Sequence, residues 1–246
     1  MGIIKTKYGY CYSANTRHSD YEDFEDCGFI INNSKKLKNI YQYVYAPENI
    51  VLSQYNAQNG KKQKGELKRF NNNLNSNLNN LSNSLEDESY QTGEYRIKII
   101  TEPKEREIMI APFYPDRIVH HCVINVMKDV WTKIFIEHTY ACIKGRGIHK
   151  CVDDLNNALK SDFNGTKFCL KLDVKKFYDN IDHECLRRIL RYRIADEQFL
   201  RLLDKIIDSN GLDKGLPIGN YTSQYLANIY LAYFDHWVKE DLGVKY

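Results

Sequence analysis

The segment 167–174 constrains the fold of this chain more than any other stretch. Every second residue in it is apolar and most positions between are charged; the apolar residues are Phe168, Leu170, Leu172 and Val174. A period of two predicts a β-strand with one face on a core. Asp173 then lies on the polar face near the strand's C-terminal end, among lysines. A carboxylate in that position can hold a divalent metal ion against phosphates; the alternative is an exposed Asp without a role.

Four strings along the chain resemble motifs of one enzyme family. They are EPKEREIMIAPFYPDRIV (102–119), YACIKGRGIH (140–149), LDVKKFYDNIDH (172–183) and GLPIGNYTSQYLANIYL (215–231). In this order they resemble the fingers hairpin, the motif between fingers and palm, the first catalytic motif and the next palm motif of the reverse transcriptases of bacterial retroelements. The resemblance covers roughly residues 95–246 and implies RNA-directed DNA synthesis.

The string from Ile218 to Gln224 departs from the pattern of most reverse transcriptases. It reads Ile-Gly-Asn-Tyr-Thr-Ser-Gln, where most of the family carries Gln-Gly and ends in Ser-Pro. That departure is typical of diversity-generating retroelements, whose enzymes copy template adenines with low fidelity. The resemblance therefore implies this subgroup.

The fold that the resemblance implies is α/β (α+β): a right-hand polymerase with fingers and a partial palm, truncated and without a thumb. Its expected parts are an N-terminal helical region (1–94), fingers (95–160) and the partial palm (161–246). The family's second catalytic motif, Tyr-x-Asp-Asp, should lie a few residues beyond Tyr246. The strand at 167–174 would then lack its central sheet partners, and because isolated strands are marginal in water we expect poor solubility.

The resemblance also implies a metal site. Nucleotidyl transfer uses two divalent ions about 4 Å apart, expected to be Mg²⁺ with Mn²⁺ as the alternative. Asp173 would bridge both ions, and the main-chain carbonyl of Val174 would bind the nucleotide-bound ion. Asp179 and Asp182 are poor substitutes because they follow the strand, and Asp182 is expected to cap a helix. The sequence thus supplies one carboxylate of the expected set.

Further positions match residues that hold the incoming dNTP in the family. Tyr178 matches an aromatic ring that clashes with a ribose 2′-hydroxyl and so selects deoxynucleotides; core packing is its alternative role. Cations on the hairpin suit the triphosphate, and a tight turn would bring backbone amides to the nucleotide. These positions are Lys104, Arg106, Ile218 and Gly219.

A second set matches contacts to the template or primer. Lys144 and Arg146 alternate with glycines, which let the backbone approach a phosphate closely. The full set is Arg117, Lys144, Arg146, Ser223 and Gln224. The expected partners are an RNA template, a DNA or RNA primer and dNTPs, with a basic accessory protein of the retroelement as a further candidate.

Periodicity outside the motifs predicts mainly helices. A short helix at 36–45 should end at Pro47, and 54–65 reads as a loop. The Asn-rich stretch 66–86 has apolar residues at steps of three and four, which favours an amphipathic helix over a disordered linker. Strands are expected at 95–101 and 106–112, and helices at 116–135, 149–161, 183–193, 196–209 and 222–241.

Composition indicates the cellular compartment of the protein more than its function. The net charge of +3 is weak evidence for nucleic acid. An odd number of cysteines without a Cys-x-x-Cys pair indicates reduced thiols in the cytoplasm. No apolar stretch is long enough to span a membrane, so no membrane partner is expected. His120, His121 and His138 have no second pair or Cys to complete a zinc site, so structural or surface roles are expected.

Two other functions stay open. A non-catalytic RNA-binding subunit would keep the basic hairpin and turn without a metal site. It would retain RNA affinity in an Asp173→Ala variant and show no extension before or after the change. A polymerase of the defence type would use the same palm without a template or with a protein primer. Extension in the absence of template would identify it.

Overall fold

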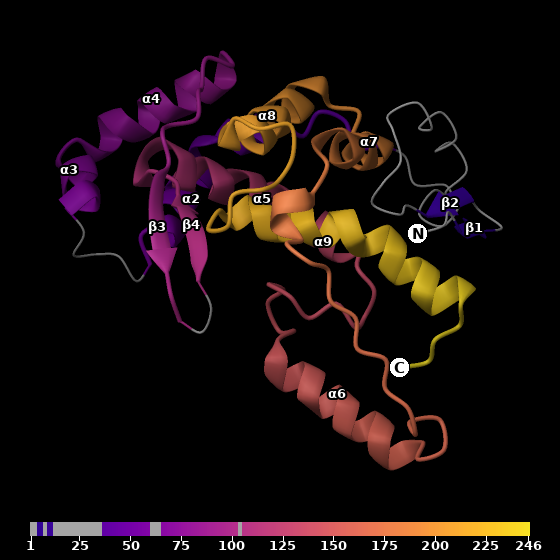
Figure 1. Cartoon of the computed structure of the whole chain (residues 1–246). Helices are drawn as coiled ribbons and strands as arrows, with labels where there is room; N and C mark the ends of the chain where they lie inside the picture. The colour runs from indigo at the N-terminus through magenta and orange to yellow at the C-terminus, as the bar shows by residue number, and fades with distance from the viewer. Residues whose placement is uncertain (1–3, 7–8, 12–35, 60–64, 103–104) are drawn as a thin grey trace.

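The computed structural model describes residues 4–6, 9–11, 36–59, 65–102 and 105–246. The helices in these ranges are α1 (Gln42–Tyr45), α2 (Pro47–Ala57), α3 (Gly65–Asn72), α4 (Leu74–Glu86), α5 (Ile118–Thr132), α6 (Ile148–Ser161), α7 (His183–Arg193), α8 (Glu197–Ile207) and α9 (Tyr221–His236). Figure 1 shows α5 and α9 in the middle of the molecule, with α7 and α8 above them and α6 below. None of these helices is long and apolar enough to cross a membrane.

Two antiparallel strand pairs accompany the helices in the described residues. β1 (Ile4–Thr6) pairs with β2 (Gly9–Cys11). β3 (Arg96–Ile100) pairs with β4 (Arg106–Ile110), and Ile100 lies opposite Arg106 at the closed end. The predicted hairpin is therefore confirmed. Lys104, which the sequence places between the two strands, lies outside the described residues. A mostly helical chain with small sheets agrees with the expected mixed α/β class.

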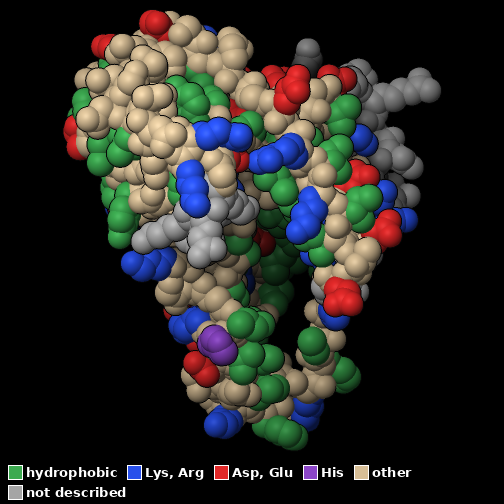
Figure 2. All heavy atoms as spheres, turned by 90° about the vertical axis from the view of Figure 1, so that its left-hand side faces the viewer, with side chains coloured by type: hydrophobic (Ala, Val, Ile, Leu, Met, Phe, Trp, Pro, Cys, Tyr) green, Lys and Arg blue, Asp and Glu red, His purple; other side chains and the backbone are tan. Residues whose placement is uncertain are grey.

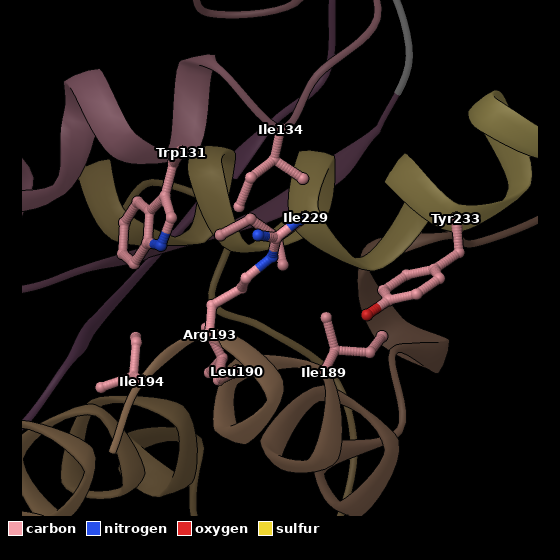
Figure 3. Close-up of a pocket in the computed structure, with 8 residues that line it drawn as sticks. All are labelled: Trp131, Ile134, Ile189, Leu190, Arg193, Ile194, Ile229 and Tyr233. Carbon is pink, nitrogen blue, oxygen red and sulfur yellow. The ribbon is translucent and has the colours of Figure 1, made fainter. Parts of the chain in front are cut away.

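One apolar cluster connects most of the helices. Trp131 of α5 is buried and lies 6.1 Å from the ring of Tyr225 on α9. Figure 3 shows Trp131 and Ile229 facing Leu190 of α7 across a cavity of about 10 Å³. That volume is close to the minimum for a single water molecule, so the helices are tightly packed here.

Pro47 separates two helices: α1 ends at Tyr45, and a second helix begins at Pro47 itself. It is the first residue of α2, which continues to Ala57. A proline at the first helical position loses no hydrogen bond, because that N–H has no acceptor within the helix. The predicted end of the first helix is confirmed, because α1 ends at Tyr45 and Ala46 leaves the helical region. The first part of the predicted loop 54–65 is wrong, because α2 continues to Ala57.

The Asn-rich stretch is helical, in two pieces. α3 and α4 are separated by Asn73, whose backbone leaves the helical region. The apolar stripe packs on the core through its buried members Leu67, Phe70, Leu81 and Leu85. This packing stabilises a helix that asparagine alone would not favour. The helical interpretation of 66–86 is confirmed.

The predicted caps of α7 and α8 are also confirmed. Asp182 accepts a hydrogen bond from the amide of Cys185 at 2.7 Å, and Asp196 accepts one from the amide of Phe199 at 3.1 Å. Asp196 also accepts from the amides of Ile40 and Tyr41, at 2.6 and 3.0 Å. One carboxylate thus begins α8 and holds the segment before α1 against it.

The predicted strand at 167–174 is wrong. The segment has no regular secondary structure, and none of the described strands pairs with it. Its apolar side chains are exposed rather than on a core: Phe168 95%, Leu170 83%, Leu172 68% and Val174 57%. Alternation specifies which face a strand would bury, but the strand itself needs a neighbour to hydrogen-bond with.

A second exposed apolar surface lies on α6. Figure 1 shows this helix apart from the other helices, and Figure 2 shows hydrophobic side chains gathered on that lower projection. They repeat at helical spacing on one face: Ile148, Val152, Leu155 and Leu159, all exposed. The apolar side chains of 168–174 are exposed as well, and exposed apolar surface of this kind marks an interaction site or an aggregation liability.

We expect the chain to self-associate through this surface. Leu170→Lys, at the centre of the exposed segment, should shift the protein toward monomer because a charge there opposes apolar contact and strand pairing. Leu212→Lys, at an exposed leucine in a separate loop, is the control and should leave association unchanged. Light scattering after gel filtration measures both. A wild-type protein that is already a monodisperse monomer with cooperative unfolding would contradict the expectation.

Candidate functional site

The turn 215–219 is held from two sides by backbone hydrogen bonds. The amide of Leu216 donates to the carbonyl of Tyr178 at 2.9 Å, and the amide of Met109 in β4 donates to the carbonyl of Ile218 at 3.0 Å. Tyr178 is half-buried, and burial is the main cause that raises its pKa. The turn therefore lies between Tyr178 and the hairpin, which brings three of the predicted nucleotide-binding elements together.

Both glycines of this turn are required by geometry. Gly215 and Gly219 have φ values of +87° and +125°, which side chains rarely adopt. A Cβ on Gly215 would lie 3.1 Å from the carbonyl oxygen of Asp179, and one on Gly219 would lie 2.7 Å from that of Met109. A side chain at Gly219 would therefore clash with the backbone of β4, and one at Gly215 would make a tight backbone contact in a strained conformation.

A buried histidine supports the start of the turn. His183 lies with Nε2 2.7 Å from the carbonyl oxygen of Gly215 and Nδ1 3.2 Å from Asp208. Asn210 donates to the same carbonyl at 2.8 Å, and Arg187 pairs with Asp208. These contacts hold the turn against the N-terminus of α7 and the end of α8, so the turn is preorganised before any ligand binds.

Asn220 connects the turn to the base of the hairpin. Its side-chain amide donates to the hydroxyl of Tyr95 at 2.6 Å, and that hydroxyl lies 2.8 Å from Ser209. Burial is the main cause that raises the pKa of Tyr95, so its hydroxyl stays protonated at neutral pH. The hairpin is therefore anchored to α9 at its base as well as along β4.

A cavity of about 220 Å³ opens beside this turn. It lies between the N-terminal turn of α5 and the start of α9, where the rings of His121 and Tyr221 approach to 4.7 Å between centroids. Its walls include three of the predicted site residues: Arg117, Gly219 and Gln224. The remaining walls are Ala111, His120, His121, Asn220 and Tyr221.

Arg117 gives the cavity a positive charge. The side chain is half-buried and makes no hydrogen bond or ion pair with another described residue. Burial lowers the pKa of its guanidinium, and the charge of Glu66 opposes that shift. A half-buried cation that makes no ion pair with a described residue favours an anionic ligand, and a phosphate matches its fork of N–H donors.

His120 is neutral at physiological pH. Its side chain is 1% exposed, and burial, with His121 and Arg117 nearby, lowers its pKa to about 3. The contribution of His120 to the free energy of unfolding should therefore be fully present above pH 6.5, the pKa of histidine in the unfolded chain. It should fall as the pH drops from 6.5 toward 3, because in this range only the unfolded chain takes up the proton.

We expect this proton uptake to cost the fold about 3 kcal/mol between pH 7 and pH 4. His120→Gln should remove that part of the pH dependence, while His149→Gln, at an exposed position on α6, should keep it. Urea unfolding at stepped pH values measures the difference. An unchanged pH dependence in His120→Gln would contradict a neutral buried imidazole.

The other predicted nucleic-acid contacts lie in different surroundings. Lys144 is exposed, two residues before Arg146 in the same loop. The guanidinium of Arg146 donates to the carbonyl of Ile136 at 2.9 Å. Arg106 is exposed at the start of β4. Ser223 is buried in the first turn of α9. Figure 2 shows lysine and arginine side chains above the hollow that separates the upper body from the projection of α6.

Asp173 and Val174 stand apart from this arrangement. Both are exposed, and the Asp173 side chain has no hydrogen bond or ion pair with a described residue. Their oxygen atoms suit a hard divalent ion. However, no group of three or more His, Cys, Asp or Glu side chains that could hold a metal occurs in the described part of the chain. These residues alone therefore do not complete a two-ion site.

Sequence reasoning missed most of the cavity wall. The sequence predicts structural or surface roles for His120 and His121 and no ligand role for the side chains of Asn220 and Tyr221. The available signal was helical spacing: three and four residues after Arg117 comes the histidine pair, and four residues after Asn220 comes Gln224. That spacing puts polar groups on one helix face, but it does not show that the two faces meet.

Comparison with known proteins matches residues 103–246 to the family described as reverse transcriptase (RNA-dependent DNA polymerase). Protein YkfC of Escherichia coli is 29% identical over 139 residues, which are 52% of this chain and 36% of that protein. The group II intron-encoded protein LtrA of Lactococcus lactis is 24% identical over 165 residues, 63% of this chain and 27% of that protein. The chain thus spans about a third or less of these relatives.

Proposed function

This chain belongs to the reverse transcriptase (RNA-dependent DNA polymerase) family, and we propose that it carries the nucleotide and template contacts of an enzyme that copies RNA into DNA from dNTPs. The observation that supports this most is the turn 215–219. It hydrogen-bonds to both Tyr178 and β4, beside a cavity lined by the Arg117 guanidinium, which makes no ion pair with a described residue. A positive cavity next to a rigid, glycine-dependent turn suits a nucleic-acid strand paired with an incoming nucleotide.

The proposed roles follow the family resemblance. Arg106 and Lys104 would bind the triphosphate, and Tyr178 would exclude the ribose 2′-hydroxyl beside Ile218 and Gly219. The proposed template and primer contacts are Arg117, Lys144, Arg146, Ser223 and Gln224. Asp173 and the carbonyl of Val174 are proposed ligands of Mg²⁺, with Mn²⁺ as the alternative. Such an ion would neutralise charge on the triphosphate.

Other parts of the proposal rest on the sequence strings. The string at 218–224 supports a diversity-generating retroelement, which would bring a basic accessory protein as partner. The division into an N-terminal region (1–94), fingers (95–160) and a partial palm (161–246) follows the motif order. Free thiols support the cytoplasm as the compartment; they are Cys122, Cys142, Cys151, Cys169 and Cys185.

Primer extension tests the function. The protein is incubated with a primed RNA template, dNTPs and Mg²⁺, with parallel reactions that lack the template or contain EDTA. We expect template-dependent DNA synthesis that EDTA abolishes. Extension without template would instead identify the untemplated or protein-primed activity. We expect no extension when ribonucleotides replace the dNTPs, because Tyr178 would exclude their 2′-hydroxyl.

A non-catalytic RNA-binding protein is the second candidate. The absence of a three-residue metal cluster from the described residues favours it, and the positive cavity would serve it equally well. Such a protein would bind RNA and show no extension under any of these conditions.

A further inference from the structure

One peptide bond joins the start of the turn 215–219 both to α7 and to Tyr178. It is the bond between Gly215 and Leu216. Its carbonyl oxygen lies 2.7 Å from Nε2 of His183, and its amide donates to the carbonyl of Tyr178 at 2.9 Å. Because a trans peptide is planar, its carbonyl and amide point in opposite directions from one rigid unit. A rotation of this unit that breaks one contact therefore displaces the other.

The peptide needs support from other residues, because it follows a glycine. Gly215 has a φ of +87°, and glycine has more conformational freedom than any other residue. Two side chains of the described residues contact its carbonyl: His183 and, at 2.8 Å, Asn210. Asn210 belongs to the same loop and also donates to the carbonyl of Lys214 at 3.0 Å. His183 is the first residue of α7, so it connects the peptide to a helix.

His183 is itself held at its other ring nitrogen. A carbonyl oxygen only accepts, so Nε2 carries the hydrogen in the contact with Gly215. Nδ1 lies 3.2 Å from Oδ1 of Asp208, directly after α8, and Arg187 pairs with the same carboxylate. The histidine is 1% exposed. Its ring is therefore fixed at both nitrogens between α7 and the end of α8, which is how supporting residues hold a site in one geometry.

We propose that His183 is a positioning residue for the choice between deoxynucleotides and ribonucleotides. It acts through the Gly215–Leu216 peptide on the backbone of Tyr178, whose ring is the proposed barrier to a 2′-hydroxyl. The inference rests on the proposed function for the reaction and for the role of Tyr178. It adds that the barrier is held from behind by a histidine of another element. Because a small displacement of the ring relieves a clash, sugar choice depends on this contact more than extension with dNTPs does.

Single-nucleotide addition tests the proposal. The measured quantity is the sugar ratio, which is kcat/KM for a dNTP divided by kcat/KM for the matching ribonucleotide. His183→Leu has a similar volume and lacks the donor, so the sugar ratio should fall about tenfold, the scale of one hydrogen bond that is not made. Addition of the dNTP should fall less. His183→Gln keeps an N–H donor and should restore the wild-type ratio.

His236→Leu is the matched control. The ring of His236 also contacts a carbonyl and a carboxylate: Nε2 lies 2.7 Å from the oxygen of Ile134, and Nδ1 lies 2.6 Å from Glu240. These contacts are at the C-terminal end of α9, away from the turn in the sequence and in the hydrogen-bond network. The variant loses contacts of the same kind, so it should lose some stability and keep the wild-type sugar ratio.

Hydrogen exchange of the Leu216 amide is a second measurement and needs no activity. Its acceptor is the carbonyl of Tyr178, so exchange should be faster in His183→Leu and unchanged in His183→Gln and His236→Leu. Asp208→Ala removes the partner of Nδ1 at a side chain that is 52% exposed. It should give an intermediate sugar ratio and intermediate exchange, and it takes the place of His183→Leu if that variant does not unfold cooperatively.

The outcomes separate this inference from the proposed function. A wild-type sugar ratio in His183→Leu, or in Asp208→Ala where it takes its place, would overturn the inference and leave RNA-templated synthesis standing. Equal losses in His183→Gln and His183→Leu would also overturn it, because the donor would not be the cause. A wild-type protein that extends no primer would defeat the proposed function and the sugar choice with it. Faster Leu216 exchange in His183→Leu alone would then still support the positioning of Tyr178 by His183.

Discussion

Asp173→Asn is expected to reduce primer extension by ~10³-fold or more while RNA affinity stays at the wild-type level. The substitution keeps the shape of the side chain and removes its negative charge. Stabilisation of a divalent ion against a triphosphate is worth several kcal/mol, and each 1.36 kcal/mol is a factor of ten in rate. The structure makes this a clean test, because the exposed Asp173 side chain has no described partner whose loss would affect folding.

Asp179→Asn is the matched control. Asp179 is also exposed and lies in the 3₁₀ turn Tyr178–Asn180, and its side chain makes no hydrogen bond or ion pair with a described residue. Single-turnover extension and RNA anisotropy are measured on both variants. Equal extension by both variants would show that Asp173 has no special role, which returns it to the alternative of an exposed Asp in a segment without regular secondary structure.

The features that the sequence predicted well depend on neighbours in the chain. Asp182 caps α7 by bonding the amide of Cys185, three residues away, and α7 has the predicted bounds. The hairpin β3–β4 is closed by a short turn. The strand predicted for 168–174 is wrong because a strand depends on residues that are distant in the sequence. Its alternation describes how a strand would lie in a sheet, while a partner strand must come from elsewhere.

The candidate site was only partly predictable for a similar reason. The motif strings identified Arg117, Gly219 and Gln224, and the structure brings these three to one cavity. Asn220 and His120 could not be recognised, because they come to the cavity wall from helices that are far apart in the sequence. Polar residues near the start of a helix are common, and only packing shows which of them meet at one cavity.

The hairpin β3–β4 and the turn 215–219 are in direct contact in the candidate site. The hairpin carries the proposed triphosphate cations, and the turn 215–219 carries the proposed nucleotide contacts. Met109 and Ile218 link them through one backbone hydrogen bond, and Gly219 lies against the same strand. A displacement of either element therefore displaces the other, so the approach of Gly219 to β4 determines the geometry of the whole site.

Gly219→Ala is expected to separate the turn from the hairpin and reduce extension roughly 10²-fold, the usual cost of misplacing reactive groups by about 1 Å. The new Cβ would lie 2.7 Å from the carbonyl oxygen of Met109, a backbone atom that a side-chain rotation cannot move away. The residue would also keep a φ of +125°, which costs an alanine about 1–3 kcal/mol. Hydrogen exchange of the Met109 amide reports the separation directly, because its acceptor is Ile218.

Gly243→Ala separates the two causes. Gly243 also has a positive φ, +64°, but a Cβ there would meet nothing within 4 Å. This variant carries backbone strain without a clash, so it should lose some stability while the Met109 amide stays protected and extension continues. If Gly219→Ala behaves in the same way, the contact with β4 is not what holds the site together. If the Met109 amide loses its protection only in Gly219→Ala, the absence of a side chain at Gly219 is what allows the turn to stay hydrogen-bonded to the hairpin.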